Sequence, residues 1–183
     1  GRRSGVGNDG GRVRRTRRRT GGWWRGAGVS TGLRELVEFC GSRSIEDGPA
    51  IDDRAGRAKL ANWAVRASGV RYTSMRAISA LSRGERPGPE NSIGKLVAGS
   101  MIQDIATYAL DLQGAAGVLS GPEEAEAAGK FQAMLLRAPG TRVEGGTDEI
   151  MRNIIAERVL GLPGDIRVDK GVPFNQIPTR GRE

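Results

Sequence analysis

The chain has 183 residues, enough for one domain with a hydrophobic core and too few for two ordinary domains. It contains no histidine and a single cysteine, Cys40, which excludes histidine-based acid–base catalysis, histidine metal ligands and an internal disulfide. Aromatic residues make up only 4% of the chain, so we expect a core built from Ala, Leu, Ile, Val and Met, a composition that favours helices over sheets.

The net charge of +8 is concentrated at the N-terminus. Residues 1–32 contain nine of the 29 basic residues and one of the 21 acids, which leaves 20 of each sign for residues 33–183. This first segment is also rich in glycine and has little to bury besides Trp23 and Trp24, so we expect a disordered basic tail. The sequence shows no signal-peptide pattern and no run of about 20 apolar residues that could span a membrane, which predicts a cytoplasmic protein.

The spacing of apolar residues predicts two helices in the first half of the folded part. The first is short, carries Leu33 and Cys40 on its apolar face, and ends at Gly41. The second begins at Pro49 and ends near Arg83, before the helix-breaking residues 87–89. Its expected buried stripe consists of Leu60, Ala64, Ala67, Val70, Met75, Ile78 and Leu81.

Three further helices are expected over residues 90–112, 122–137 and 148–160. The fourth helix has Pro122 in its first turn, and the fifth is stopped by Gly161 and Pro163. Long helices with short connectors and no strand pattern predict an all-α fold, an antiparallel four-helix bundle over residues 33–163 with an irregular tail at 164–183. The apolar face of the third helix is expected to comprise Ile93, Val97, Met101, Ile105, Tyr108 and Leu112.

Two glycine-containing loops allow both a structural and a functional interpretation. Gly114 and the small residues up to Gly117 fit a helix C-terminus, but they would also let the phosphates of a ligand approach the backbone. Thr147, after two glycines, fits a helix N-cap, but the unpaired N–H groups there could also hold an anion or the polar edge of a cofactor. Spacing alone favours the structural interpretation of both loops. The acid pairs 52–53 and 123–124 are most simply explained as helix starts, and no metal-ligand spacing is present.

One stretch of the sequence resembles the terminal signature of the acyl-CoA dehydrogenase family. Residues 145–163 read Gly-Gly-Thr-Asp-Glu-Ile-Met-Arg-Asn-Ile-Ile-Ala-Glu-Arg-Val-Leu-Gly-Leu-Pro, and the family pattern reads Gly-Thr-x-(Glu/Gln)-Ile-x-Arg followed by an apolar helix. Residues 90–96 and 110–114 also resemble the bundle helix of the family and its glycine loop. The resemblance covers residues 33–183 and is strongest over 88–170.

The resemblance implies a flavoenzyme of which this chain would be only the C-terminal bundle, without the N-terminal helical domain and the middle β-domain. Family members bind FAD between subunits, oxidise acyl-CoA thioesters at Cα and Cβ, and pass the electrons to an electron-transfer flavoprotein. By position, Gly114 and Ala115 would approach the FAD pyrophosphate of a partner subunit, and Thr147 and Glu149 would contact the adenosine half. A homo-oligomer or a hetero-oligomer with a complete catalytic subunit is therefore expected.

Two departures from the family pattern concern the catalytic base. Many members place a glutamate directly before the Gly-Thr pair, where this chain has Gly145; Glu144 lies one residue too early, so we do not assign it as the base. Other members carry the base on the helix that enters the bundle, which would fall within residues 1–32, where the resemblance is lost. We therefore expect a catalytically incomplete chain, and we hypothesise a truncated or frame-shifted start. Upstream DNA that encodes no acyl-CoA dehydrogenase sequence in another frame would contradict this hypothesis.

Two other functions remain open on the sequence. The arginine-rich segment 1–32 could bind nucleic acid non-specifically and with strong salt dependence, and deletion of that segment, with the bundle intact, would then cause a steep loss of RNA affinity. Alternatively, the chain could be a non-catalytic helical fragment or subunit that associates through exposed apolar faces.

Overall fold

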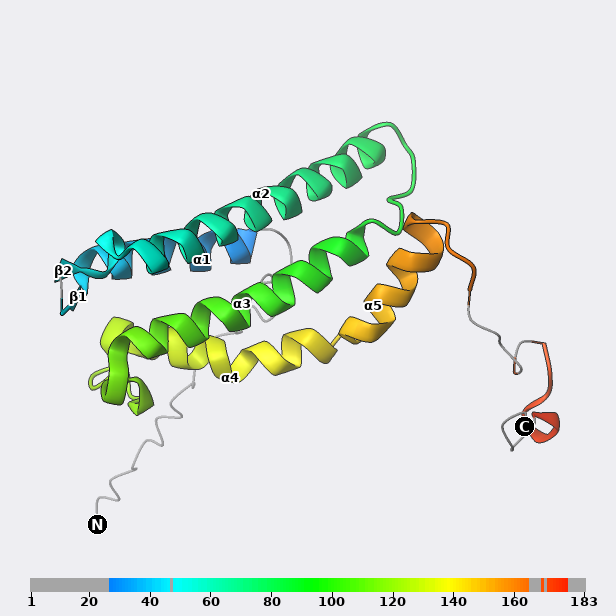
Figure 1. Cartoon of the computed structure of the whole chain (residues 1–183). Coiled ribbons are helices and arrows are strands. Elements are labelled where there is room, and N and C mark those ends of the chain that lie inside the picture. The colour runs from blue at the N-terminus through cyan, green and yellow to red at the C-terminus, as the bar shows by residue number, and fades with distance from the viewer. Residues whose placement is uncertain (1–26, 47, 165–168, 170, 178–183) are drawn as a thin grey trace, which may run out of the picture.

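A computed structural model describes residues 27–46, 48–164, 169 and 171–177; the disorder predicted for residues 1–26 lies outside this part of the chain. The described residues form an all-α fold in which α3 is central and packs against the other four α-helices (Figure 1). The helix α5 continues into a single π-helical turn, Ile155–Val159. The α-helices are α1 (Ala27–Ser42), α2 (Arg54–Ser82), α3 (Asn91–Gln113), α4 (Lys130–Val143) and α5 (Asp148–Ile154).

The first helix is longer than its apolar pattern predicts. It begins at Ala27, six residues before the expected start, so residues 27–32 belong to α1 and not to a tail. The pattern misses this part because Gly32 is buried through its backbone: a Cβ added there would lie 3.2 Å from Cε of Met134 on α4. A glycine at such a contact contributes no hydrophobic signal to the sequence.

The second helix starts later than Pro49, so the predicted start is wrong. Residues Gly48–Pro49 (β2) pair antiparallel with Ser44–Ile45 (β1), and one 3₁₀ turn follows before α2. The carboxylate of Asp53 then accepts a hydrogen bond from the N–H of Gly56 and caps the helix. Proline suits both the first turn of a helix and an extended segment, and here the acidic N-cap determines where the helix begins.

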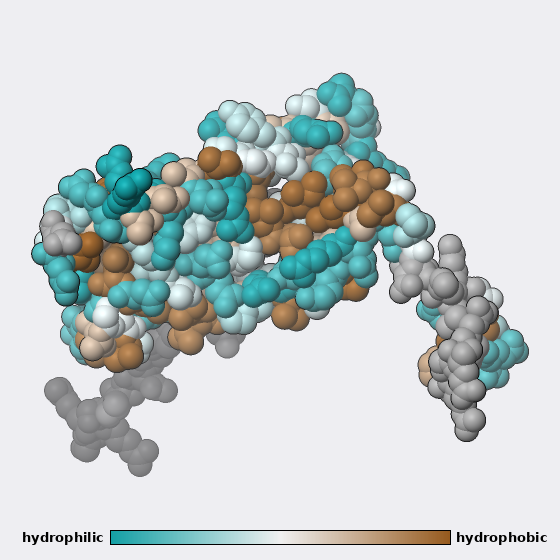
Figure 2. All heavy atoms as spheres, in the orientation of Figure 1, coloured by the Kyte–Doolittle hydropathy of each residue, from teal (hydrophilic) through white to brown (hydrophobic). Residues whose placement is uncertain are grey.

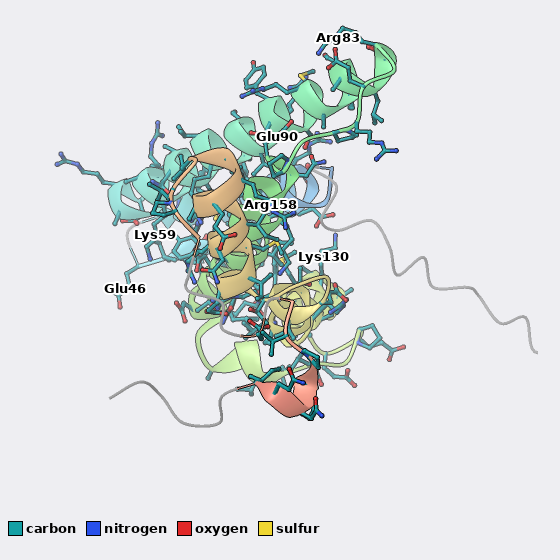
Figure 3. All side chains as sticks on the ribbon, turned by 90° about the vertical axis from the view of Figure 1, so that its right-hand side faces the viewer. Glu46, Lys59, Arg83, Glu90, Lys130 and Arg158 are labelled. Atoms are coloured by element: carbon teal, nitrogen blue, oxygen red, sulfur yellow. The ribbon has the colours of Figure 1, made fainter. Side chains whose placement is uncertain are left out.

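The buried stripe predicted for α2 is only half correct. Leu60 and Val70 are buried, but Met75, Ile78 and Leu81 are 44%, 63% and 57% exposed. In this half of α2 the buried residues are instead Ala77 and Ala80, so the helix packs through a different face from the predicted one. The helix α1 lies along only the first half of α2, and Arg83 lies at the far end (Figures 1 and 3). Hydrophobic side chains gather between α2 and α3 on this half of the molecule (Figure 2). Apolar patches of this kind are typical of surfaces that contact other protein segments.

The third helix agrees with its prediction to within a residue at each end, but the bounds predicted for the fourth are wrong. Pro122 lies in a turn, and α4 begins only at Lys130 and continues past Pro139 to Val143. The start is set by Gly129, which is buried and left-handed (φ 69°) and approaches the carbonyl oxygen of Ser120. A side chain at Gly129 would be strained, so the chain can bend sharply there and redirect into the helix.

The core includes buried aromatic residues, so the expectation of a core built only from Ala, Leu, Ile, Val and Met is wrong. Phe131 on α4 is only 1% exposed, and its ring centroid lies 5.3 Å from that of Phe39 on α1. Trp63 on α2 is also buried and packs against Tyr108 on α3. The remaining core is aliphatic, as composition suggests, and includes Leu36, Ala98, Met101, Ile102, Ile105, Ala106, Ala109, Met134 and Ala138.

Charge is distributed unevenly over the bundle, although residues 33–183 are neutral by count. The helix α2 contains six basic residues and no acid, so it forms a positively charged edge. In the described part of the chain, no helix combines the length and apolar character needed to cross a membrane.

The reactivity of the Cys40 thiol can test whether α1 packs into the core. The residue is fully buried on α1, and burial raises the pKa of its thiol, which reduces the reactive thiolate fraction at any given pH. We expect its alkylation at mildly alkaline pH to be at least roughly 100-fold slower in the native protein than in guanidinium chloride, because reaction requires opening of the core. Comparable rates in the two conditions, followed by mass spectrometry, would show that α1 does not pack as described.

Candidate functional site

The four residues predicted to bind a cofactor form two separate pairs in this structure. Gly114 and Ala115 follow the C-terminus of α3, next to the start of α4, whereas Thr147 and Glu149 lie beyond its end (Figure 1). The fourteen residues of α4 separate the two pairs by roughly 20 Å, given a rise of about 1.5 Å per residue. The two pairs are therefore not parts of one continuous surface around a single phosphate.

The first pair lies on an exposed turn without bulky side chains. Gly114 has a φ of 58° and ends α3, and a Cβ added to it would meet no atom within 4 Å. Ala115 is also exposed, and the chain continues as a 3₁₀ turn to Val118. Such a turn combines the cap function that the sequence favours with room for a ligand to approach the backbone.

Two buried glutamine side chains, Gln113 and Gln132, lie next to this turn and are hydrogen-bonded to each other. Gln113 is 2% exposed, and its Oε1 accepts a hydrogen bond of 2.9 Å from Nε2 of Gln132, which also donates to the carbonyl oxygen of Gly117. Among the described residues, Nε2 of Gln113 and Oε1 of Gln132 have no hydrogen-bond partner. Unpaired buried amide groups are costly and call for an additional partner, so this pair suits a polar ligand at the turn.

The second pair caps the start of α5. Oγ1 of Thr147 accepts a hydrogen bond from the N–H of Ile150, which confirms the predicted N-cap. Hydrogen bonds from its own backbone N–H and then from the Thr147 hydroxyl lower the pKa of the Glu149 carboxyl. The side chain of Glu149 is 76% exposed, so this end of α5 presents an ionised acceptor to the solvent.

A polar network beneath this loop was not predicted from the sequence. Asp148, at the first position of α5, is 4% exposed, and its Oδ2 accepts hydrogen bonds from Nε and Nη2 of Arg142 at 2.7 and 2.6 Å. Arg142 also donates through Nη1 to Oε1 of Gln103 at 3.0 Å. Nζ of Lys95 donates to the carbonyl oxygens of Arg142 and Gly146. The only sequence signal was a lone lysine within the apolar helix 91–113.

The position at which the resemblance led us to look for a catalytic base, residue 145, has no carboxylate. Gly145 stands there with a φ of 68°, and the neighbouring Glu144 is exposed, where both of its carboxylate oxygens accept hydrogen bonds from Nη2 of Arg137 at 2.6 Å. Neither residue presents a base to the α5 loop. In the described ranges, no group of three or more acidic, histidine or cysteine side chains is arranged to hold a metal ion.

We expect substitutions at the two glycines before α5, Gly145 and Gly146, to differ in their effect on the free energy of unfolding. Gly146 has a φ of 110°, and a Cβ there would lie 2.5 Å from Cε of Met151, whereas the space around Gly145 is open. We expect Gly146→Ala to reduce the free energy of unfolding by about 2–3 kcal/mol and Gly145→Ala by about 1 kcal/mol, since a φ of 110° lies outside the left-handed region that other residues can adopt, whereas 68° lies within it. Urea unfolding checks this difference, and equal losses would show that the loop has another conformation.

Comparison with known proteins finds a protein family and curated relatives that resemble this chain. Residues 16–160 match a family described as the C-terminal domain of acyl-CoA dehydrogenase. The chain is 31% identical over 132 residues to acyl-CoA dehydrogenase IpdE1 of Mycolicibacterium smegmatis, covering 72% of this chain and 30% of that protein. It is likewise 31% identical over 135 residues to IpdE1 of Mycobacterium tuberculosis, covering 74% and 32%. The chain thus spans about a third of the length of these relatives.

Solved structures share the fold. The ChsE4–ChsE5 complex from Mycobacterium tuberculosis matches with a TM-score of 0.65 and 24% identity, over 76% of this chain and 37% of the other. Butyryl-CoA dehydrogenase from Megasphaera elsdenii matches with a TM-score of 0.60 and 20% identity, over 74% and 34%. A structure of PigA solved as its FAD complex matches with a TM-score of 0.62 and 19% identity, over 76% and 34%.

Proposed function

Because this chain belongs to the acyl-CoA dehydrogenase family, as its helical C-terminal domain, we propose that it contributes two surfaces to FAD sites shared between the subunits of an oligomer. The assembly would carry out the α,β-dehydrogenation of acyl-CoA thioesters and deliver the electrons to an electron-transfer flavoprotein. Since the chain spans about a third of its curated relatives, the acyl-CoA pocket would be formed largely by other polypeptide segments.

The observation that carries this proposal is the exposed turn at Gly114, next to Gln113, whose amide nitrogen Nε2 has no partner among the described residues. A turn without bulky side chains admits a pyrophosphate to the backbone, and the amide group supplies a nearby donor. Ala115, exposed beside Gly114, adds no bulk to this approach.

The second surface suits the adenosine half of the cofactor. The capped start of α5 carries a positive helix end, and the Glu149 carboxylate can accept a hydrogen bond from a ribose hydroxyl. Pyrophosphate and adenosine are neighbouring groups within FAD, but the two surfaces lie roughly 20 Å apart in one chain, at about 1.5 Å of rise per residue along α4. Each surface would therefore serve a different FAD molecule, which supports a site shared between subunits.

These residues indicate which parts of the reaction this chain would support and which would depend on other segments. Gly114 and Ala115 of one chain and Thr147 and Glu149 of another would hold FAD, which would supply a hydride acceptor for Cβ of the substrate. The proton at Cα would be removed by a base outside the residues described here, because Gly145 occupies the position used by many relatives and Glu144 is held by Arg137. This chain would orient the cofactor and complete its binding site, without supplying the proton acceptor.

The experiment is a flavin-retention assay on the chain purified in high salt, which removes nucleic acid bound to the arginine-rich segment. After incubation with FAD and gel filtration, we expect flavin absorbance to coelute with an oligomer. Ala115→Leu should reduce retention at least roughly tenfold by blocking the turn, whereas Ala133→Leu, at an exposed position of α4, should not. A helical protein that retains no flavin would contradict the proposal, and RNA affinity that survives high salt would favour the nucleic-acid alternative.

A further inference from the structure

Lys95 joins three helices through two main-chain carbonyl groups. Its side chain extends from α3, and its ammonium group donates to the carbonyl oxygen of Arg142, in the last turn of α4, at 2.9 Å and to that of Gly146 in the following loop. The last carbonyl groups of a helix have no partner within the helix, and a cation near them is favourable. Lys95 therefore connects the end of α4 and the beginning of α5 to α3.

Arg142 closes the same loop from the other side. Its guanidinium group bridges Gln103 on α3 and the buried carboxylate of Asp148 at the start of α5. The arginine crosses α3 at Gly99, where an added Cβ would lie 3.3 Å from Cγ of Arg142, so the absence of a side chain there makes room for it. The loop between Arg142 and Asp148 is thus held at both ends by side chains that contact α3.

The contacts of Lys95 and Arg142 restrain a loop that would otherwise have unusually high conformational freedom. Gly145 and Gly146 both have positive φ angles, and glycine loses more conformational freedom on ordering than any other residue. A loop that is already ordered before a ligand arrives does not lose this entropy on binding. The loop leads directly into Thr147 and Glu149, so its order determines how the end of α5 meets a ligand.

We propose that Lys95 is a positioning residue for the α5 surface: by binding the carbonyl groups of Arg142 and Gly146, it fixes Thr147 and Glu149 in the orientation that receives the ligand. The identity of the ligand, the adenosine half of FAD, rests on the proposed function. The ordering of the loop by Lys95 is independent of that identity and can be measured in the chain without flavin.

The test compares Lys95→Met with Lys95→Arg and with Lys130→Met, which removes a lysine from an ion pair with the partly buried Glu35, away from the α5 loop. Hydrogen exchange of residues 144–152 is measured in the flavin-free chain, and FAD affinity by equilibrium dialysis, at a temperature where circular dichroism shows every variant folded. We expect Lys95→Met to accelerate exchange of this segment and to weaken FAD binding, each about tenfold, while exchange in the α2 and α3 core is unchanged. Lys95→Arg should restore both quantities to within about threefold, and Lys130→Met should alter neither.

The outcomes distinguish a positioning role of Lys95 from a general role in stability. They also test this role separately from the proposed binding of FAD. Unchanged exchange of residues 144–152 in Lys95→Met would overturn the inference whatever happens to FAD affinity. Parallel acceleration over the whole bundle would also overturn it, because Lys95 would then be a general stability residue. If the unmodified chain takes up no FAD while Lys95→Met loosens only this loop, the proposed flavin function fails and the positioning role stands. If Lys95→Met does not fold, Lys95→Gln, which keeps a donor group, is measured in its place.

Discussion

Replacing Phe131 with alanine is expected to reduce the free energy of unfolding by about 3–5 kcal/mol, a large fraction of the 5–15 kcal/mol typical of a domain. The ring is only 1% exposed and packs against Phe39, so its removal leaves a cavity where α1 meets α4. Few aromatic residues are available to fill such a space, because they make up 4% of the chain. Urea unfolding followed by circular dichroism measures the loss.

The matched control is Leu136→Ala on the same helix. Leu136 is 80% exposed, so we expect this substitution to change the free energy of unfolding by no more than about 0.5 kcal/mol. Both variants place alanine in α4, so the difference between them isolates burial from helix propensity. Similar losses in the two variants would mean that α4 does not present Phe131 to α1.

The helices that the sequence predicts best are those with two independent signals. The third helix combines an apolar period with the breaker at residues 87–89 and with Gly114, and its observed bounds lie within a residue of those predicted. The fifth combines the Gly-Gly-Thr start with an N-cap at Thr147, and the structure shows the hydrogen bond that this cap requires. Agreement between periodicity and end signals makes a helix predictable from sequence.

Two of the three helix starts that were predicted wrongly, those of α2 and α4, relied on a proline. Pro49 and Pro122 have the backbone angle of a first helical turn, but the same angle suits a short strand or a turn. The chain reaches α2 only after Asp53 and α4 only after Gly129. The decision depends on contacts with distant residues, such as the approach of Gly129 to Ser120, which local sequence does not contain.

The candidate site was predictable where it depends on helix ends and not where it depends on tertiary contacts. Gly114 and Thr147 lie at helix ends, as their sequence patterns indicate. The roles of Lys95 and Gln113 could not be predicted, because Lys95 binds main-chain carbonyl groups and Gln113 binds a glutamine nineteen residues away. Main-chain acceptors are the same at every residue, so only the fold identifies them.

Replacing Arg142 with methionine is expected to reduce the free energy of unfolding by about 3 kcal/mol, because it leaves the buried Asp148 carboxylate without its partner. The Asp148 side chain is 5% exposed, and its other oxygen, Oδ1, accepts no hydrogen bond from the part of the chain that the structure describes. Methionine keeps most of the aliphatic volume of arginine, so the loss reports the uncompensated charge and not a cavity. Urea unfolding at neutral pH, where the carboxylate of a free aspartate is ionised, measures it.

The opposite substitution, Asp148→Leu, should have a smaller effect, about 1 kcal/mol, because the Arg142 side chain is 40% exposed and its guanidinium group can turn into water. The double variant Arg142→Met with Asp148→Leu should then be more stable than Arg142→Met alone, since it removes the stranded charge together with its partner. This asymmetry follows from the unequal burial of the two groups. A loss for Asp148→Leu that equals or exceeds the loss for Arg142→Met would show that Asp148 is accessible to solvent, and that the network under the α5 loop is looser than the structure indicates.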